Sequence, residues 1–597
     1  MARVGRLLSL FASVLLAEAC APARPAPAPH AAPPPVAAAR RAVLVSFDGT
    51  SGVRLARLLS EPGKLATGGF RRLAENGFLA VRSIPCSPSL TPAAHATHIT
   101  GALPRDTGIV GNVLLDPTRP FGARRNGFDT PLRAETLCEA ARRQGKRVGV
   151  MAYPHGAGTP PTGCAGFGMN WVADPVSRPR VTRFAAGSWS PSAAAGVPSY
   201  SPPKGAVLEF PPTAHRAAIV ALDSTNDGRL DYDSLRVQPE VGAAVIVHPG
   251  ETFPVEVRGK SGRAGSWCKL LSIAADLSKT EVYCGGLWES DVFPEEFRRE
   301  VDRKAGFWPG RADYNVFGPH SEHPEVYLEQ SDRLTEFLTK ADLAALARPD
   351  WDLLLLYQSE VDAVEHHFLL ADPKQEEYTP ERAARFAGFI DHAYADADRA
   401  ISRFLALLTP RDSLFVTSDH GMTPLHTEIY PPELLVENGF TKLGKDRNFD
   451  PSSTAVAMVS SGAAHVYVNP TAPAGTLDSV EKLLSAFRVR GESPWDVVVR
   501  REAAGDLALD APESGDLILL AKPGYHLSMS LRPGRLSGPS EEYGGHGYRA
   551  AYPEIDATFL AMGPGISNEK IDEMSSTLIA SRVAAALGID PPRNARR

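Results

Sequence analysis

Three continuous apolar runs, each leading into polar residues, constrain the fold of this chain more than any other feature. Residues 41–49 read RAVLVSFDG, residues 351–358 read WDLLLLYQ and residues 413–421 read SLFVTSDHG. Uninterrupted apolar strands are typical of a parallel sheet that is covered on both faces. Ligands bind such sheets at the carboxyl ends of the strands, so the polar residues there are candidates for a functional site.

The remaining pattern alternates strands with helices, which favours a doubly wound α/β fold. Further strands are expected at 79–84, 147–152, 516–521 and 557–562, and helices at 53–76, 91–101, 131–144, 379–408 and 573–587. The alternation is lost between 157 and 345, where Pro, Gly and Ser are frequent and short hairpin-like segments occur. We interpret 157–345 as an inserted, mainly β region or cap, and 41–156 with 346–597 as the main domain.

The N-terminus has the features of an export signal. A basic segment precedes an apolar run at 7–17, which is shorter than the about 20 residues that span a bilayer. Small residues follow it, so 1–19 is interpreted as a signal peptide. Cys20 stands where bacterial lipoproteins carry an acylated cysteine, although Glu18 replaces the usual small residue; lipidation and simple cleavage both stay open. Residues 20–40 are rich in Pro and Ala and are expected to form an extended tether. The expected location is periplasmic, membrane-anchored or secreted.

The cysteines and the net charge limit the environment and the partners. In an oxidising compartment, Cys138–Cys164 and Cys268–Cys284 are candidate disulfides by their proximity, although spacing does not determine connectivity. Cys86 would then be unpaired. The net charge of −6 shows no basic footprint for a nucleic-acid polymer, so that class of partner is not expected. Nothing in the sequence indicates an oligomeric state.

Thr91 is the candidate nucleophile. It begins the expected helix 91–101, and Pro92 follows at a position that tolerates proline. A hydroxyl in the first helical turn faces free N–H groups and the positive end of the helix dipole, which can bind an oxyanion. Thr-Pro at this place is also typical of an ordinary helix cap. The assignment therefore depends on acidic and histidine residues elsewhere in the chain.

Six such residues lie at strand ends or in Gly-rich turns. Asp362 and His366 are four apart, so on a helix they share a face and can chelate one ion. A mixed oxygen and nitrogen ligand set suits Zn²⁺ better than Mn²⁺ or Fe. Taken singly, each residue has an ordinary alternative as a cap or a surface residue, but their common placement favours a metal centre. The six are Asp48, Asp362, His366, Asp419, His420 and His546.

Seven separated motifs resemble those of the alkaline phosphatase superfamily, and most of all its type I phosphodiesterase/nucleotide pyrophosphatase branch. They occur in the family's order, and the middle insert is not covered. The motifs are SFDG at Ser46, T-x3-H-x4-TG from Thr91, GIVGN at Gly108, EVDAVEH at Glu360, TSDHGM at Thr417, GGHGY at Gly544 and MGPG at Met562. The resemblance implies an alkaline-phosphatase-like three-layer sandwich with a mostly parallel central sheet, with the catalytic domain at 41–156 and 346–597.

Carried over by position, the resemblance implies a two-metal site, with Zn²⁺ as the expected ion. Asn112 is implied as a donor to a phosphoryl oxygen, and Thr107 stands where the family usually has a His. Thr91 would attack phosphorus and form a phospho-threonine. One metal site is implied at Asp362, His366 and His546, and the other at Asp48, Asp419, His420 and Thr91.

The predicted function is hydrolysis of a small phosphodiester or phosphoanhydride. A monoester dianion usually needs an extra cation, and the stretch 83–104 contains no Lys or Arg, which favours a diester; the insert could still supply one. The alternatives are a phosphomonoesterase, a phosphonate hydrolase or a transferase on the same site, and a non-enzymatic exported metal-binding protein. A sulfatase is disfavoured, because Leu90 replaces the Arg of the C-x-P-S-R signature that begins at Cys86.

Overall fold

The computed structural model describes residues 41–156, 163–192, 197–260 and 262–596. The predicted signal peptide at 1–19, Cys20 and the tether at 20–40 lie outside the described residues. None of the helices in the described ranges combines the length and the apolar character needed to cross a membrane.

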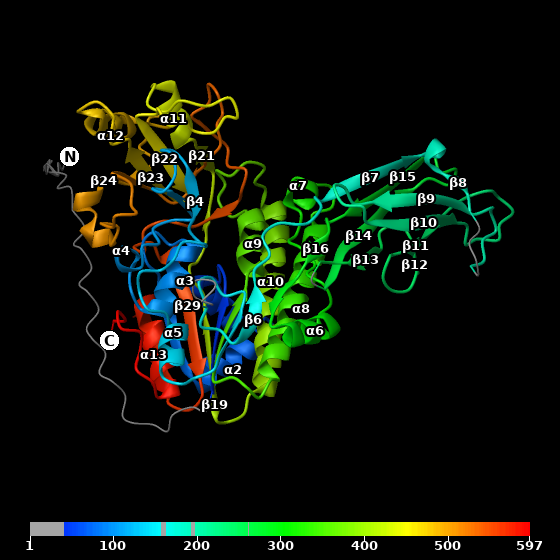
Figure 1. Ribbon diagram of the computed structural model, residues 1–597, viewed down its shortest axis with the longest axis horizontal. Coiled ribbons are helices and arrows are strands. Elements are labelled where there is room, and N and C mark those ends of the chain that lie inside the picture. The colour runs from blue at the N-terminus through cyan, green and yellow to red at the C-terminus, as the bar shows by residue number, and fades with distance from the viewer. Residues whose placement is uncertain (1–40, 157–162, 193–196, 261, 597) are drawn as a thin grey trace, which may run out of the picture.

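A nine-stranded sheet forms the centre of the protein (Figure 1). Five of its eight neighbouring strand pairs are parallel and three are antiparallel. The predicted α/β fold with a mostly parallel sheet is therefore confirmed. In sheet order the strands are β17 (Asp291–Phe293), β6 (Phe167–Asn170), β5 (Val148–Met151), β18 (Leu353–Gln358), β1 (Arg41–Phe47), β19 (Asp412–Thr417), β29 (Ala557–Met562), β2 (Phe78–Ile84) and β30 (Glu569–Ser575).

The three apolar runs are the middle strands of this sheet. Strand β1 lies between β18 and β19 and is parallel to both. Residues 42–45 of β1 and 353–356 of β18 are completely buried, as expected for strands covered on both faces. Because the three strands run in the same direction, their carboxyl ends meet at one edge of the sheet.

Helices cover both faces of the sheet and give the three-layer arrangement (Figure 1). The helices of one face are α3 (Thr91–Thr100), α5 (Leu137–Arg143) and α13 (Ile579–Leu587). Those of the other face include α2 (Gly69–Asn76), α6 (Glu295–Lys304), α8 (Glu325–Leu346), α9 (Glu360–Phe368) and α10 (Pro380–Leu407).

Three predicted helices differ from the observed ones. The segment 53–76 forms two helices, α1 (Gly52–Ser60) and α2, because the Pro-Gly turn and the left-handed Gly63 and Gly68 interrupt it. The segment 131–144 is helical only from Leu137, where Thr136 and Glu139 form a capping box. The segment 573–587 begins as strand β30, which pairs with β2 at the edge of the sheet, and only its second half is helical.

The predicted insert contains two antiparallel sheets that project from the body (Figure 1). The two ends of the range 157–345 are not part of a mainly β insert. Strands β6 and β17 join the central sheet, and helices α6 and α8 pack beside it. One sheet holds β8 (Ser190–Pro191), β9 (Lys204–Glu209), β10 (Arg216–Leu222), β11 (Ser234–Gln238) and β12 (Val245–Val247). The other holds β7 (Arg180–Ala185), β13 (Thr252–Arg258), β14 (Arg263–Ile273), β15 (Lys279–Cys284) and β16 (Trp288–Glu289).

A separate four-stranded sheet lies beyond the carboxyl edge of the central sheet (Figure 1). The strand predicted at 516–521 belongs to this antiparallel sheet and not to the central one, which corrects its placement. The short hairpin β3 (Val113–Leu115) and β4 (Arg124–Asn126) packs against it through Val113 and Leu115. In order, its strands are β22 (Ala455–Ser460), β23 (Ala463–Val468), β25 (Leu517–Ala521) and β24 (Trp495–Arg500).

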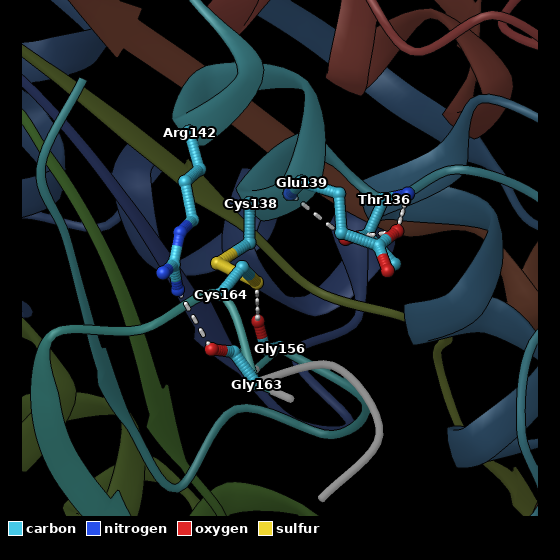
Figure 2. Close-up of a disulfide and its surroundings, with 7 residues drawn as sticks. All are labelled: Thr136, Cys138, Glu139, Arg142, Gly156, Gly163 and Cys164. Atoms are coloured by element: carbon cyan, nitrogen blue, oxygen red, sulfur yellow. Dashed lines mark hydrogen bonds between the residues drawn. A yellow bond between two sulfur atoms is a disulfide. The ribbon is translucent and has the colours of Figure 1, made fainter. Parts of the chain in front are cut away.

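Both candidate disulfides are present, and Cys86 is free and buried. Cys268–Cys284 joins β14 to β15. Figure 2 shows Cys138 of α5 bonded to Cys164, with Arg142 donating to the Gly163 carbonyl at 2.9 Å. The second bridge therefore fixes the chain that follows β5 against α5.

Candidate active site

Four of the segments that carry predicted site residues meet at the same edge of the sheet. Asp48 follows β1, Asp419 follows β19, and α9 carries Asp362 one turn after β18. Strand β2 is antiparallel to β29, which is antiparallel to β19, so β2 points toward this edge too. Thr91 is the first residue of α3, which follows β2, and Pro92 comes next.

The first group of ligands surrounds the ring of His420. Its Nε2 lies 3.1 Å from Asp419 Oδ2, 3.6 Å from Asp48 Oδ1 and 3.4 Å from Thr91 Oγ1. Asp419 and His420 are completely buried, and Thr91 retains only a small exposed fraction. The four side chains therefore present oxygen and nitrogen atoms to one small volume.

The second group forms around Asp362. Its Oδ1 lies 3.5 Å from His366 Nε2 and 3.9 Å from His546 Nε2. The rings of His546 and His420 stack with centroids 3.7 Å apart, and ligand atoms of Asp362, His420 and His546 lie within 4.8 Å of one another. The two groups are thus adjacent, and His420 lies between them.

All three histidines direct Nε2 into the site because Nδ1 faces a backbone carbonyl. Each Nδ1–H donates to that carbonyl oxygen, which in a neutral imidazole leaves the Nε2 lone pair free for a cation. The carbonyls belong to Gly544 for His366 (2.9 Å), Gly421 for His420 (3.1 Å) and Ser89 for His546 (2.8 Å). Burial lowers the pKa of both His420 and His546, so these two imidazoles are neutral, as ligands must be. Asp362 and Glu542 outweigh burial and raise the pKa of His366 to about 10, so a cation there would replace the Nε2 proton.

The carboxylates meet the requirements of cation ligands. Asp48 Oδ1, Asp362 Oδ1 and Asp419 Oδ2 are buried and have no hydrogen-bond partner among the described residues. Burial raises the pKa of all three, with repulsion between the carboxylates adding to it, and the pKa of Asp362 and of Asp419 reaches about 7. Unpaired buried carboxylates are costly unless a positive charge compensates them. These oxygens together with the imidazole nitrogens fit divalent cations such as Zn²⁺.

The backbone and a buried tyrosine hold these carboxylates in place. Tyr357 at the end of β18 donates its hydroxyl to Asp48 Oδ2, and the Gly49 N–H donates to Asp419 Oδ1 at 3.2 Å. The Asp362 N–H donates to the Asp48 carbonyl at 3.1 Å. The first two contacts each bind one oxygen of a carboxylate and leave the other oxygen directed into the site. The third contact fixes the backbone of Asp362.

Gly49 permits the close approach of these segments. Its φ is +69°, in the left-handed region that glycine adopts without strain. A Cβ atom on this residue would lie 2.6 Å from Cα and 2.8 Å from Cβ of Asp362. The SFDG turn therefore lets α9 begin directly against the end of β1.

The ligand groups open into a cavity of about 1500 Å³. Thr91 lines it, and so does Asn112, whose Oδ1 is buried without a partner. Tyr153 and His155, from the segment after β5, form part of its wall. A small organic phosphate can therefore reach the Thr91 hydroxyl.

Several residues near the site were not predicted. Glu542 lies 3.2 Å from His366 Nδ1; burial opposes its ionisation, but His366 lowers the pKa of Glu542 to about 2. His95, one turn after Thr91, lies 2.8 Å from the Thr91 carbonyl and 2.9 Å from Ser46 Oγ. The T-x3-H spacing was a signal for His95, because it places that ring against the start of the helix. Glu542 carried no such signal.

A threonine hydroxyl beside grouped carboxylates and imidazoles is the arrangement that the motif resemblance implied. Over residues 42–209 and 235–549 the chain matches the type I phosphodiesterase / nucleotide pyrophosphatase family. These ranges make up most of the chain, and the protein belongs to this family, a branch of the alkaline phosphatase superfamily.

Individual relatives are more distant or match only a short segment. The chain is 42% identical over 55 residues to alkaline phosphatase PhoV of Synechococcus elongatus, a match that covers 9% of this chain and 10% of that protein. Among solved structures, murine ectonucleotide pyrophosphatase / phosphodiesterase 5 aligns at 15% identity and a TM-score of 0.49, with 93% of this chain and 97% of that chain covered. Phosphonoacetate hydrolase of Sinorhizobium meliloti, in complex with phosphonoformate, aligns at 17% identity and a TM-score of 0.47, with 92% and 97% covered.

Proposed function

We propose that the protein is an exported two-metal phosphodiesterase or nucleotide pyrophosphatase that acts through a phospho-threonine at Thr91. One observation carries the proposal. Three unpaired carboxylate oxygens and three imidazole Nε2 atoms form two adjacent groups, one of which includes the Thr91 hydroxyl, and both groups line an open cavity. The matched family supplies the reaction class.

Two divalent cations would be held by the two ligand groups described above. Bound there, they would neutralise the carboxylates, lower the pKa of the Thr91 hydroxyl and polarise the phosphoryl group. With charges of +4 from the cations and −4 from three carboxylates and an alkoxide, the site would accept an anionic phosphoryl group.

The chain's own residues account for the two displacements. Thr91 Oγ1 forms a bond to phosphorus while the bond to the leaving oxygen breaks, and the leaving group departs as an alcohol after taking up a proton. Water then attacks the phospho-threonine, which releases the phosphate product and restores the hydroxyl. The Thr91 backbone N–H, which is free at the start of α3, and the Asn112 side chain would hold the phosphoryl oxygens.

The wall of the cavity bears on the choice between diester and monoester. Arg124, Arg125 and Arg311 line the cavity, and Arg311 comes from the range predicted as the insert. A cation on the phosphoryl oxygens would favour a monoester or a phosphonate. None of the three arginines makes a hydrogen bond or ion pair with Thr91 or with the predicted ligands in the described structure, so we propose the diester as substrate.

The proposal is tested with bis-p-nitrophenyl phosphate and p-nitrophenyl phosphate as a substrate pair. The wild type should prefer the diester, and Thr91→Ala should lower turnover by about a thousandfold or more, because the nucleophile is lost. Thr91→Ser keeps a hydroxyl and should retain part of the activity. Full turnover by Thr91→Ala would contradict the nucleophile, and a strong preference for the monoester would move the protein to the monoesterase alternative.

Thr97 offers a matched control on the same helix. It is completely buried, and its hydroxyl donates to the Ala93 carbonyl at 3.0 Å, away from the cavity. Thr97→Ala should therefore lower stability but leave turnover close to that of the wild type. An equal loss in both variants would show that disruption of the helix, and not loss of the nucleophile, explains the effect.

A further inference from the structure

A second cavity, with a volume of about 660 Å³, has an arginine-rich lining. Guanidinium groups and apolar side chains share its wall, and no Asp or Glu belongs to the lining described. We refer to it as the arginine cavity. It is lined by Arg124, Arg447, Asn448, Phe449, Met529, Leu531, Arg532, Pro533 and Arg535.

Three of its four arginines are not neutralised by an ion pair. Among the described residues, Arg124, Arg447 and Arg535 have no carboxylate within ion-pair distance, whereas Arg532 pairs with Glu541 at 2.7 Å. Like charges that share one cavity repel each other unless an anion lies between them. The excess of positive charge therefore favours an anion in the cavity.

The contacts that hold these side chains leave their charge unneutralised. Arg124 donates to Asn448 Oδ1 at 3.3 Å, and Arg535 donates to a backbone carbonyl two residues later at 3.4 Å. Arg447 interacts with Glu433 only at longer range. Arg447 and Arg535 are exposed, so an anion from solvent can reach them directly.

The arginine cavity is adjacent to the catalytic cavity, because Arg124 lines both. Arg124 lies on β4, and the neighbouring Arg125 and Asn126 line the catalytic cavity together with Asn112. Figure 1 shows β4 between the central body and the sheet that contains β22 and β23. The hairpin thus leads from the phosphoryl site to the cluster of arginines.

We propose that the arginine cavity binds a second anionic group of the substrate, of the phosphate class. This inference rests on the proposed function, because the scissile diester is taken to lie at Thr91. Guanidinium groups bind phosphate oxygens through charge-assisted, often bidentate hydrogen bonds. The side chains of Phe449, Met529 and Leu531 provide apolar contact for the part of the substrate that joins the two groups. The protein is thereby selective for diesters that carry a further phosphate.

A series of p-nitrophenyl alkyl phosphodiesters tests the inference by activity. The alkyl arm, of increasing length, ends either in a methyl group or in a phosphate. At one arm length, kcat/KM of the wild type should be about tenfold higher for the phosphate-ended diester than for the methyl-ended diester of equal length. This is the effect of one good charge-assisted contact. The Arg447→Ala/Arg535→Ala double variant should lose this gain.

Arg490→Ala is the matched control. Arg490 is exposed and, like Arg447, has a positive φ (+50° against +62°), but it lines neither cavity. It should keep the gain. If the wild type hydrolyses the methyl-ended diesters but shows no gain at any arm length, or if the double variant keeps the gain, the inference is wrong while the proposed function stands.

If no diester is hydrolysed, the proposed function is contradicted. Direct binding still tests the anion site of the arginine cavity in that case. Inorganic tripolyphosphate is titrated calorimetrically into the wild type, the double variant and Arg490→Ala. The double variant should lose one binding site or about tenfold in affinity, and the control should match the wild type. Equal affinity and stoichiometry in all three proteins would overturn the anion site whatever the activity.

Discussion

Replacing Gly49 with alanine perturbs the point where the two ligand groups are joined. The new Cβ atom would lie 2.6 Å from Cα of Asp362, and φ at this position is +69°. A non-glycine residue in the left-handed region costs about 1–2 kcal/mol, and overpacking a close contact adds about 1–3 kcal/mol. The expected loss of stability is therefore about 2–5 kcal/mol.

The clash also acts on catalysis, because relief of the overlap must move Asp362 away from the end of β1. A displacement near 1 Å in a catalytic constellation can lower turnover by about a hundredfold. The assay is turnover of bis-p-nitrophenyl phosphate, measured together with the midpoint of thermal unfolding. Gly49→Ala should lower both.

Gly63→Ala separates strain from overlap. Gly63 also has a positive φ (+79°), but a Cβ atom there would meet nothing within 4 Å. This variant should lose only the about 1–2 kcal/mol of backbone strain and keep wild-type turnover. If the two variants matched in stability and in turnover, the close packing of Asp48-Gly49 against α9 would be refuted.

Three further predictions concern stability, pH and metals. Cys138→Ser should lower the free energy of unfolding by about 3 kcal/mol, measured by thermal or denaturant unfolding, because the disulfide no longer restricts the unfolded chain. Asp342 is buried, with one carboxylate oxygen unpaired and the other accepting a hydrogen bond from Gln358 at 2.6 Å, and burial raises the pKa of Asp342. Above the ordinary pKa of an aspartate, ionisation of Asp342 in the unfolded chain therefore favours unfolding. Asp342→Asn should stabilise the protein at neutral pH but not at acidic pH, and an equal effect at both would contradict this. Chelation should abolish turnover, and added Zn²⁺ should restore it, while circular dichroism shows a retained fold; turnover that withstands chelation would contradict the two-metal mechanism.

The sequence predicted the centre of the sheet because burial on both faces requires apolar residues at every position. Strands β1, β18 and β19 satisfy this condition, and the polar residues that follow them must then share one edge. The start of α3 at Thr91 was predictable from Pro92. These local rules were sufficient to bring together the predicted ligands without knowledge of the loops between them.

Two of the predictions that failed depend on pairing between distant segments. Residues 569–575 are mostly polar, and only pairing with β2 makes them a strand. The strand at 516–521 has the same apolar character as a central strand, and its neighbours β23 and β24 decide its sheet. The roles of Glu542 and Tyr357 likewise arise from tertiary contacts with His366 and Asp48.

The stereochemical course at phosphorus tests the central claim most directly. A diester made chiral at phosphorus with sulfur and oxygen isotopes is hydrolysed by the wild type, and the configuration of the product is determined. Two in-line displacements, first by Thr91 and then by water, predict retention of configuration. Inversion would show a single attack by water and would contradict the phospho-threonine intermediate.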